Sequence, residues 1–214
     1  NIGMTVNWNT NRTSGLKNMT FGFVVNRTNS WDEDVYAVGR NSTTSFMGAM
    51  AYDATDRYLW AEDLGSADAY DFLPTDVWDK IVGYQSGMIS TFGGYDDQFV
   101  GASELIFTNP NTGNDEIALG GTLEQAYGRR VTGGKYDYVF NFGANVSDFL
   151  YIGANLGIST LDYNYSEYFK ESAVDPSDFE ISFEDGSAMY FEQMKYNYSY
   201  AVSGSGVYAK FGFI

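Results

Sequence analysis

The 214-residue chain contains no cysteine and no histidine. Without them it can form neither a disulfide nor a Ser-His-Asp or Cys-His catalytic group, and it has no histidine to bind zinc or haem. The G-x-S-x-G elbow of lipase-like hydrolases is also missing. We therefore expect that the protein is not an enzyme and has no catalytic residues, metal site or cofactor.

Long apolar runs and positive charge are also scarce. No stretch of about 18 apolar residues occurs, so no transmembrane helix is expected. The net charge of −16 makes nucleic acid an unfavourable partner. The chain starts at Asn1, with no signal peptide, and it begins and ends inside strand-like sequence. From this we expect a fragment whose neighbouring sequence is missing.

Glycine and aromatic residues are abundant, with 24 Gly, 18 Tyr and 16 Phe, whereas proline occurs only three times. This composition favours β-strands separated by turns. Residues 32–121 differ, because apolar residues at helical spacing predict a helix over 75–89 with Thr75 as its N-cap, and shorter helices at 43–54 and 57–63. Period-two alternation predicts about five strands, at residues 1–9, 17–31, 122–146, 149–165 and 188–214.

The five predicted strands each have one uncharged apolar face and one face of small polar residues. An outer-membrane β-barrel would turn the apolar face to lipid, whereas a soluble β-sandwich would turn it inward. Aromatic residues near strand ends and the alternation of short and long connections favour the barrel, and the sandwich stays open. The apolar stripes are 2, 4, 6, 8; 19, 21, 23, 25; 136–146 (even); 150–160 (even); and 207–213 (odd).

Several stretches resemble the FadL/TodX family of outer-membrane transport proteins, particularly its Bacteroides-type members that are often labelled putative haemin receptors. They are NMTFGF at 18–23, VW at 77–78, GGKYDYVFNFGANVSDFLYIGANLG at 133–157 and GSGVYAKFG at 204–212. The resemblance implies an all-β fold: an antiparallel transmembrane β-barrel of 14 strands, of which this chain supplies about five strands and one large, partly helical extracellular loop, 32–121. The family's N-terminal plug with its Asn-Pro-Ala motif is absent, because the only Asn-Pro is Asn109-Pro110.

The function that the resemblance implies is uptake of hydrophobic small molecules, such as long-chain fatty acids or aromatic hydrocarbons, across the bacterial outer membrane. The expected partners are the hydrophobic ligand, outer-membrane lipid and lipopolysaccharide, and the remaining barrel strands and plug. The alternative is a structural or adhesive surface barrel that binds partners through its long acidic loops. The acidic clusters 32–34, 96–97 and 184–185 lack calcium-binding spacing and are expected to be solvated, with cation binding a weaker option.

Two sets of candidate site residues follow. Apolar residues of the 32–121 insertion are expected either to line a groove that captures ligand or to form the insertion's own core; they are Phe46, Met50, Trp60, Leu73, Trp78, Ile81 and Met88. Polar residues expected to face the barrel lumen would contact ligand or plug, or form a hydrogen-bonded network; they are Asp137, Asn141, Asn145, Tyr151, Asn155 and Lys210. A bulge or kink is expected at 203–206, as a curvature device or a lateral gate.

Overall fold

The computed structural model describes residues 1–182 and 186–214, and most of them lie in antiparallel β-strands. The chain divides into two compact units. Unit 1 comprises Asn1–Val35, Arg129–Glu167 and Asn197–Ile214, and unit 2 comprises Tyr36–Gly128 and Tyr168–Tyr196. In the described part of the chain, no helix has the length and apolar character needed to span a membrane.

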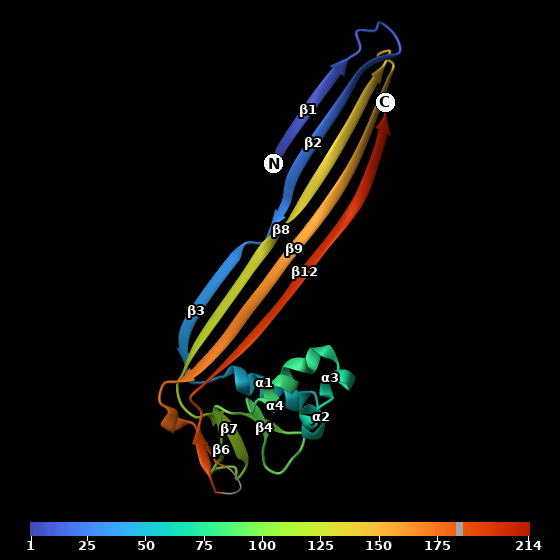
Figure 1. Cartoon of the computed structure of the whole chain (residues 1–214). Coiled ribbons are helices and arrows are strands. Elements are labelled where there is room, and N and C mark those ends of the chain that lie inside the picture. Colours follow the sequence, from blue (N-terminus) through green and yellow to red (C-terminus); the bar gives the residue numbers. More distant parts are fainter. Residues whose placement is uncertain (183–185) are drawn as a thin grey trace. The chain divides into compact units, whose positions relative to one another are not determined.

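Unit 1 is built from a sheet with the strand order β1-β2-β8-β9-β12 (Figure 1). The strands lie close to the positions that the sequence predicts. The sheet is open within the described residues, since β1 and β12 are its edges and do not pair with each other. The bounds are β1 Ile2–Asn9, β2 Leu16–Ser30, β8 Leu123–Val146, β9 Leu150–Ala173 and β12 Gln193–Phe213.

Two strand segments were missed by the sequence interpretation. Strand β3, Glu33–Asn41, pairs with β8, although these residues were assigned to the insertion. Strand β9 continues past Tyr165 to Ala173, through residues that were read as the start of an acidic loop. Both segments are rich in charged and polar side chains, which hide the alternation on which a strand prediction depends.

The turn between β8 and β9 explains how these strands keep their register. Ser147 and Asp148 have φ values of 58° and 57°, as a two-residue type I′ turn requires. The Phe149 amide donates to the Val146 carbonyl at 3.1 Å and closes the turn. Asn145 holds it from the side, because its side-chain amide donates to Asp148 at 2.9 Å and its oxygen accepts from the Asp148 amide at 3.0 Å.

An extra residue on β2 interrupts the pairing of β2 with β8 at two places. The β2–β8 register shifts between Leu16 and Asn18 and again between Arg27 and Asn29. The extra residue of the second shift is Thr28 on β2, and it lies opposite Lys135 and Tyr136. Gly133 has a φ of 138°, and a Cβ there would come within 2.1 Å of the Asp162 carbonyl oxygen, so only glycine fits.

The kink expected at residues 203–206 does not occur. Strand β12 is unbroken from Gln193 to Phe213. Tyr151 and Ile214 exchange backbone hydrogen bonds of 2.9 and 3.0 Å, which fixes the β9–β12 register at one end. Counting along both strands without an insertion places Tyr165 opposite Tyr200, and their rings indeed stack with centroids 5.0 Å apart. The register is therefore unshifted through this segment, and the structure gives no support to a lateral gate there.

Unit 2 contains short helices and three small hairpins. Helix α1 begins where Ser45 accepts a hydrogen bond from the Gly48 amide, as an N-cap does. The helix predicted over 75–89 is instead a 3-10 turn followed by α4. Pro74 occupies the N-cap position of the 3-10 turn, so Thr75 is the first residue of that turn and not an N-cap. The elements are α1 Phe46–Asp56, α2 Ala61–Gly65, α3 Ala69–Phe72, η1 Thr75–Val77, α4 Trp78–Gln85, β4 Ile89–Thr91, β5 Phe99–Gly101, β6 Glu104–Thr108, β7 Asp115–Leu119, η2 Pro176–Asp178, β10 Glu180–Ser182 and β11 Ala188–Tyr190.

The hairpins of unit 2 pair β4 with β5, β6 with β7 and β10 with β11. Strand β10 lies in the stretch that the sequence interpretation left between the strands at 149–165 and 188–214. Residue 183 and the acidic pair Glu184-Asp185 lie outside the described residues. Two apolar clusters form the core of this unit, one around Leu64 and Ile81 and the other around Met47 and Phe179.

Candidate functional site

The cross-strand register brings the apolar stripes of β1, β2 and β8 onto one face of unit 1. Val6 lies opposite Phe21, which lies opposite Phe142, and the next row is aligned in the same way. The rings of Phe21 and Phe142 contact each other with centroids 5.3 Å apart, and those of Phe23 and Phe140 are 4.9 Å apart. We call this side of the sheet the apolar face.

The apolar face is uncovered in the structure of this chain. Phe142, in the middle strand, is 36% exposed, and Phe211, on the edge strand β12, is 84% exposed. Soluble monomeric proteins rarely leave an apolar surface of this extent in contact with water, so it marks an interaction surface for a protein partner, a ligand or a membrane. Its exposed large members are Ile2, Met4, Val6, Trp8, Phe21, Phe140, Phe142, Ile152, Leu156, Ile158, Val207, Phe211 and Phe213.

The opposite side, here called the polar face, carries small and polar side chains. Thr5, Gly22 and Asn141 occupy one cross-strand row of it. On the next strand, the Ser159 hydroxyl donates to the Asp137 carboxylate, which places Ser159 on the same face. The structure therefore separates apolar from polar side chains across one sheet, as a wall between lipid and a polar interior would require.

The residues predicted to face a lumen are partly brought together. Tyr151, Asn155 and Lys210 line one open hollow of about 490 Å³ at the end of β9 and β12. Asp137 and Asn141 lie farther along β8 on the polar face. Asn145 lies instead beside the β8–β9 turn, where the residue is 8% exposed and its side-chain amide donates a hydrogen bond to Asp148.

A cluster of five aromatic residues, one tryptophan and four tyrosines, lies on the polar face. Alternation along β9 puts Tyr163 and Tyr165 on the side of Ser159. The rings of Tyr163 and Trp31 are 5.5 Å apart, and those of Tyr165 and Tyr200 are 5.0 Å apart. Because these tyrosines share the polar side, they do not form an outward-facing interfacial girdle. We call this group the aromatic cluster; its members are Trp31, Tyr163, Tyr165, Tyr198 and Tyr200.

The cluster formed because a bulge reverses the alternation of β2. Before the bulge at Thr28, odd-numbered residues such as Val25 lie on the apolar face. After it, Asn29 lies opposite Lys135, so odd-numbered residues, Trp31 included, lie on the polar face. Period-two alternation along the β2 sequence does not predict this reversal of the two faces.

The seven apolar residues predicted to capture ligand do not form one groove. Met50 and Ile81 are buried in the core of unit 2, and Leu73 and Met88 pack against that core. Phe46 joins both clusters and stacks on Phe169 with centroids 5.0 Å apart. The remaining two, Trp60 and Trp78, are exposed on the surface. The alternative of a core for the insertion thus accounts for most of the set.

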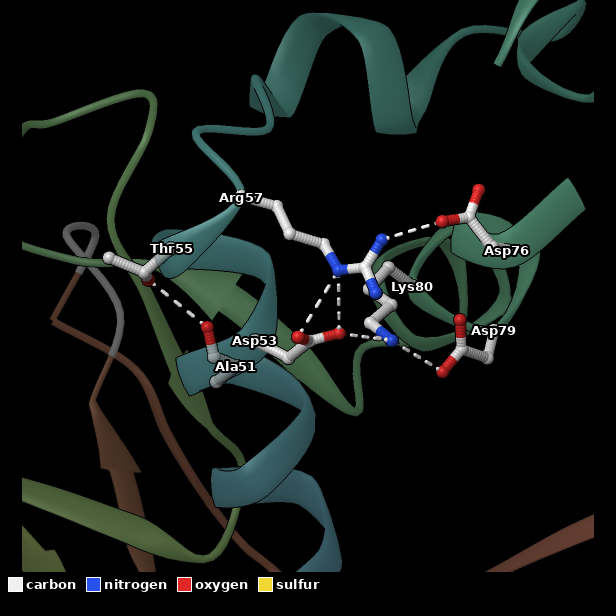
Figure 2. A network of polar contacts seen from close by, with 7 residues as sticks. All are labelled: Ala51, Asp53, Thr55, Arg57, Asp76, Asp79 and Lys80. Atoms are coloured by element: carbon white, nitrogen blue, oxygen red, sulfur yellow. Dashed lines mark hydrogen bonds and ion pairs between the residues drawn. The ribbon is translucent and has the colours of Figure 1, made fainter. Parts of the chain in front are cut away.

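An ion-pair network joins α1 to α4 in unit 2 (Figure 2). The Lys80 ammonium lies 2.5 Å from Asp53 and 2.8 Å from Asp79, and Arg57 pairs with Asp53 at 3.1 Å and Asp76 at 2.8 Å. Burial alone would lower the pKa of Lys80, but the two carboxylates raise it above its ordinary value. The Lys80 ammonium is thereby held charged between the two helices, so the network has a structural role.

Two carboxylates without a cationic partner lie near the start of α1. Glu171 is fully buried, and its Oε1 accepts from the Phe46 amide and from Gln125, both at 2.7 Å. Its Oε2 has no hydrogen-bond partner within the described residues. Glu104 accepts from the Gly101 amide at 2.8 Å. Burial raises the pKa of both carboxyl groups, and the proximity of Glu104 adds to the effect on Glu171.

Neither glutamate was singled out from the sequence. Glu171 lies in the part of β9 that was read as a loop, and Glu104 precedes a short apolar run in β6. No motif marks them, because their environment comes from residues far away in the chain. Within the described residues, no group of three or more acidic side chains is arranged to hold a metal ion.

No family model, curated protein or solved structure matches the chain. The candidate sites are therefore defined by three features of the structure: the apolar face, the polar face with its aromatic cluster, and the acidic residues of unit 2.

Proposed function

We propose that this chain forms part of the wall of a bacterial outer-membrane β-barrel that takes up hydrophobic small molecules, such as long-chain fatty acids or aromatic hydrocarbons. The observation that carries the proposal is the exposed apolar face, on which the aligned stripes of β1 (2–8, even), β2 (19–25, odd) and β8 (136–146, even) carry no charged residue. A lipid-facing charge near the middle of a bilayer costs about 2–4 kcal/mol, which explains why a wall of this kind excludes charged residues.

The open edges of the sheet require further strands under this proposal. Unpaired backbone groups are too costly in lipid, so membrane sheets close into barrels of at least about eight strands. Strands β1 and β12 would pair with strands outside this chain, in a 14-stranded barrel if the FadL/TodX resemblance holds. A plug would also come from outside the chain.

The aromatic cluster is the best-supported contact for a ligand inside such a barrel. Its rings lie on the polar face, and Tyr198 and Tyr200 are exposed. Stacked and tilted rings offer apolar surface to an alkyl chain or an aromatic ring, and the Tyr165 hydroxyl is satisfied by donating to Glu167 at 2.5 Å. The polar face would thus combine a hydrated wall with one apolar contact.

The double substitution Tyr165→Ala with Tyr200→Ala tests this role. In liposomes that contain the complete barrel, uptake of a labelled fatty acid should fall about threefold to tenfold, because each aromatic contact contributes about 0.5–1.5 kcal/mol. Tyr52→Ala is the matched control, since Tyr52 is exposed on α1 in unit 2. Absence of uptake by the unaltered protein with any hydrophobic probe would contradict the proposed function and favour an adhesive or structural protein.

A further inference from the structure

Unit 2 contains an open hollow of about 1110 Å³, and among its described lining residues Met88 is the one member of the predicted ligand-capturing set. It is lined by residues of α1, β4, β5, β6, β10 and β11 and by the segments beside them. Its volume is slightly above the range of about 300–1,000 Å³ typical of small-molecule sites. All of its lining belongs to unit 2, so the hollow is defined within one compact body.

The apolar part of the lining is rich in methionine. Four of the seven methionines in the chain line the hollow: Met47, Met88, Met189 and Met194. Met47 and Met194 are buried in the core, whereas Met189 is exposed. Methionine side chains are flexible and polarizable and adapt to apolar ligands of varied shape, and Tyr190 and Phe191 add aromatic surface. We call this cavity the methionine hollow.

The charged part of the lining has one sign. Glu104, Glu180 and Glu192 line the hollow, and no lysine or arginine is found among the described lining residues. The nearby Lys195 ammonium lies instead over the Tyr168 ring, 4.5 Å from its centroid. Glu180 accepts hydrogen bonds from the hydroxyl groups of Ser182 and Tyr190, at 3.5 and 3.4 Å. The carboxylates of the hollow therefore lack a cation from the lining itself.

We propose that the methionine hollow binds an amphiphilic organic cation, with its alkyl or aromatic body against the methionines and its ammonium group beside the three glutamates. Aromatic faces and carboxylates together are the groups that recognise alkylammonium ions. A fatty acid would bring its carboxylate next to three others, which is unfavourable. The inference concerns binding by unit 2 and does not depend on the proposed transport function.

The partial burial of Glu104 agrees with this assignment. Burial raises the pKa of its carboxyl group, and the hydrogen bond from the Gly101 amide opposes this effect. A cation bound in the hollow would stabilise the ionised form of Glu104. Gly48 permits this placement, because a Cβ there would come within 2.1 Å of the Glu104 carboxylate oxygen Oε1.

Three probes with the same tail separate the head-group preference from general apolar binding. They are octyltrimethylammonium, octanol and octanoate, measured by equilibrium dialysis against the full chain, with a protein-free control subtracted. The expected order of affinity is the ammonium compound first, the alcohol second and the carboxylate last. Equal affinity for octyltrimethylammonium and octanol would overturn the proposal.

Two charge-matched variants locate the preference. Glu104→Gln with Glu180→Gln and Glu192→Gln should weaken binding of octyltrimethylammonium about tenfold and leave octanol binding unchanged. The control carries Glu62→Gln, Glu116→Gln and Glu124→Gln, three exposed glutamates of unit 2 outside the hollow. Equal losses in both variants would show a general surface-charge effect and contradict the site.

Two further variants keep the test decisive. If the triple variant does not fold, Glu180→Gln with Glu192→Gln alters only the two exposed members and should still weaken ammonium binding. Met88→Asn with Met189→Asn should weaken binding of both the ammonium compound and octanol, because it removes apolar surface from the hollow. Unchanged binding in both double variants would place the probe elsewhere.

Discussion

Replacing Phe142 with lysine should lower the free energy of unfolding of the membrane-embedded protein by about 2–4 kcal/mol. Phe142 lies in the interior strand β8 on the apolar face, opposite Phe21. A lysine at this position would place its ammonium in lipid, where no described side chain of the apolar stripes offers a countercharge. The measurement is reversible denaturation of the complete barrel in liposomes, followed by the electrophoretic shift of the folded form.

The neighbouring residue supplies the control for that experiment. Asn141 lies on the polar face of the same strand, in the row of Gly22 and Thr5. Asn141→Lys adds the same charge at nearly the same height of the sheet and should change stability by less than about 1 kcal/mol. Comparable destabilisation by both substitutions would mean that the two faces meet similar surroundings, contrary to a membrane wall.

Replacing Ile81 with alanine should destabilise unit 2 by about 2–5 kcal/mol. The Ile81 side chain is fully buried in the cluster that contains Leu64 and Phe99, so its truncation leaves a cavity. Chemical denaturation, monitored by hydrogen exchange of α4 amides, measures the loss. The result matters for function because Ile81 was predicted to contact ligand.

Trp78→Ala is the matched comparison for Ile81. Trp78 begins the same helix, α4, but is 42% exposed and contacts Tyr70 at the surface, with ring centroids 5.5 Å apart. Its removal should cost clearly less stability than the Ile81 change. If Ile81→Ala were instead neutral for stability and selectively reduced ligand uptake, Ile81 would be a contact residue rather than a core residue.

The strands of unit 1 could be predicted because their signal is local. Alternation of apolar and polar residues depends only on the two faces of one strand, and the type I′ turn at Ser147–Asp148 fixes the β8–β9 hairpin. Strand β3 was missed because its pairing with β8, not a stripe of apolar residues, makes it a strand. The bulge at Thr28 was also missed, and with it the side on which Trp31 lies.

The sites were harder to predict than the strands because they depend on contacts between distant segments. The spacing of an apolar residue in the sequence is the same whether its side chain packs in a core, as that of Met50 does, or lies exposed, as that of Trp60 does. Glu171 bonds to Phe46, 125 residues earlier in the chain. The acidic lining of the methionine hollow likewise comes from β6, β10 and the segment after β11. Such groupings require the tertiary structure.

The central claim, that the apolar face of unit 1 lies against lipid, is tested most directly by single-cysteine labelling, since the chain has no native cysteine. Cysteines at Phe140, Phe142, Ile152 and Leu156 in the reconstituted barrel should resist a water-soluble maleimide, and a fluorophore attached to them before reconstitution should be quenched by a lipid-borne quencher. Cysteines at Asn141, Gly143, Gly153 and Asn155 should show the reverse. Apolar-face positions that are protected from both reagents would indicate a buried protein core, as in a soluble sandwich, and would contradict the account.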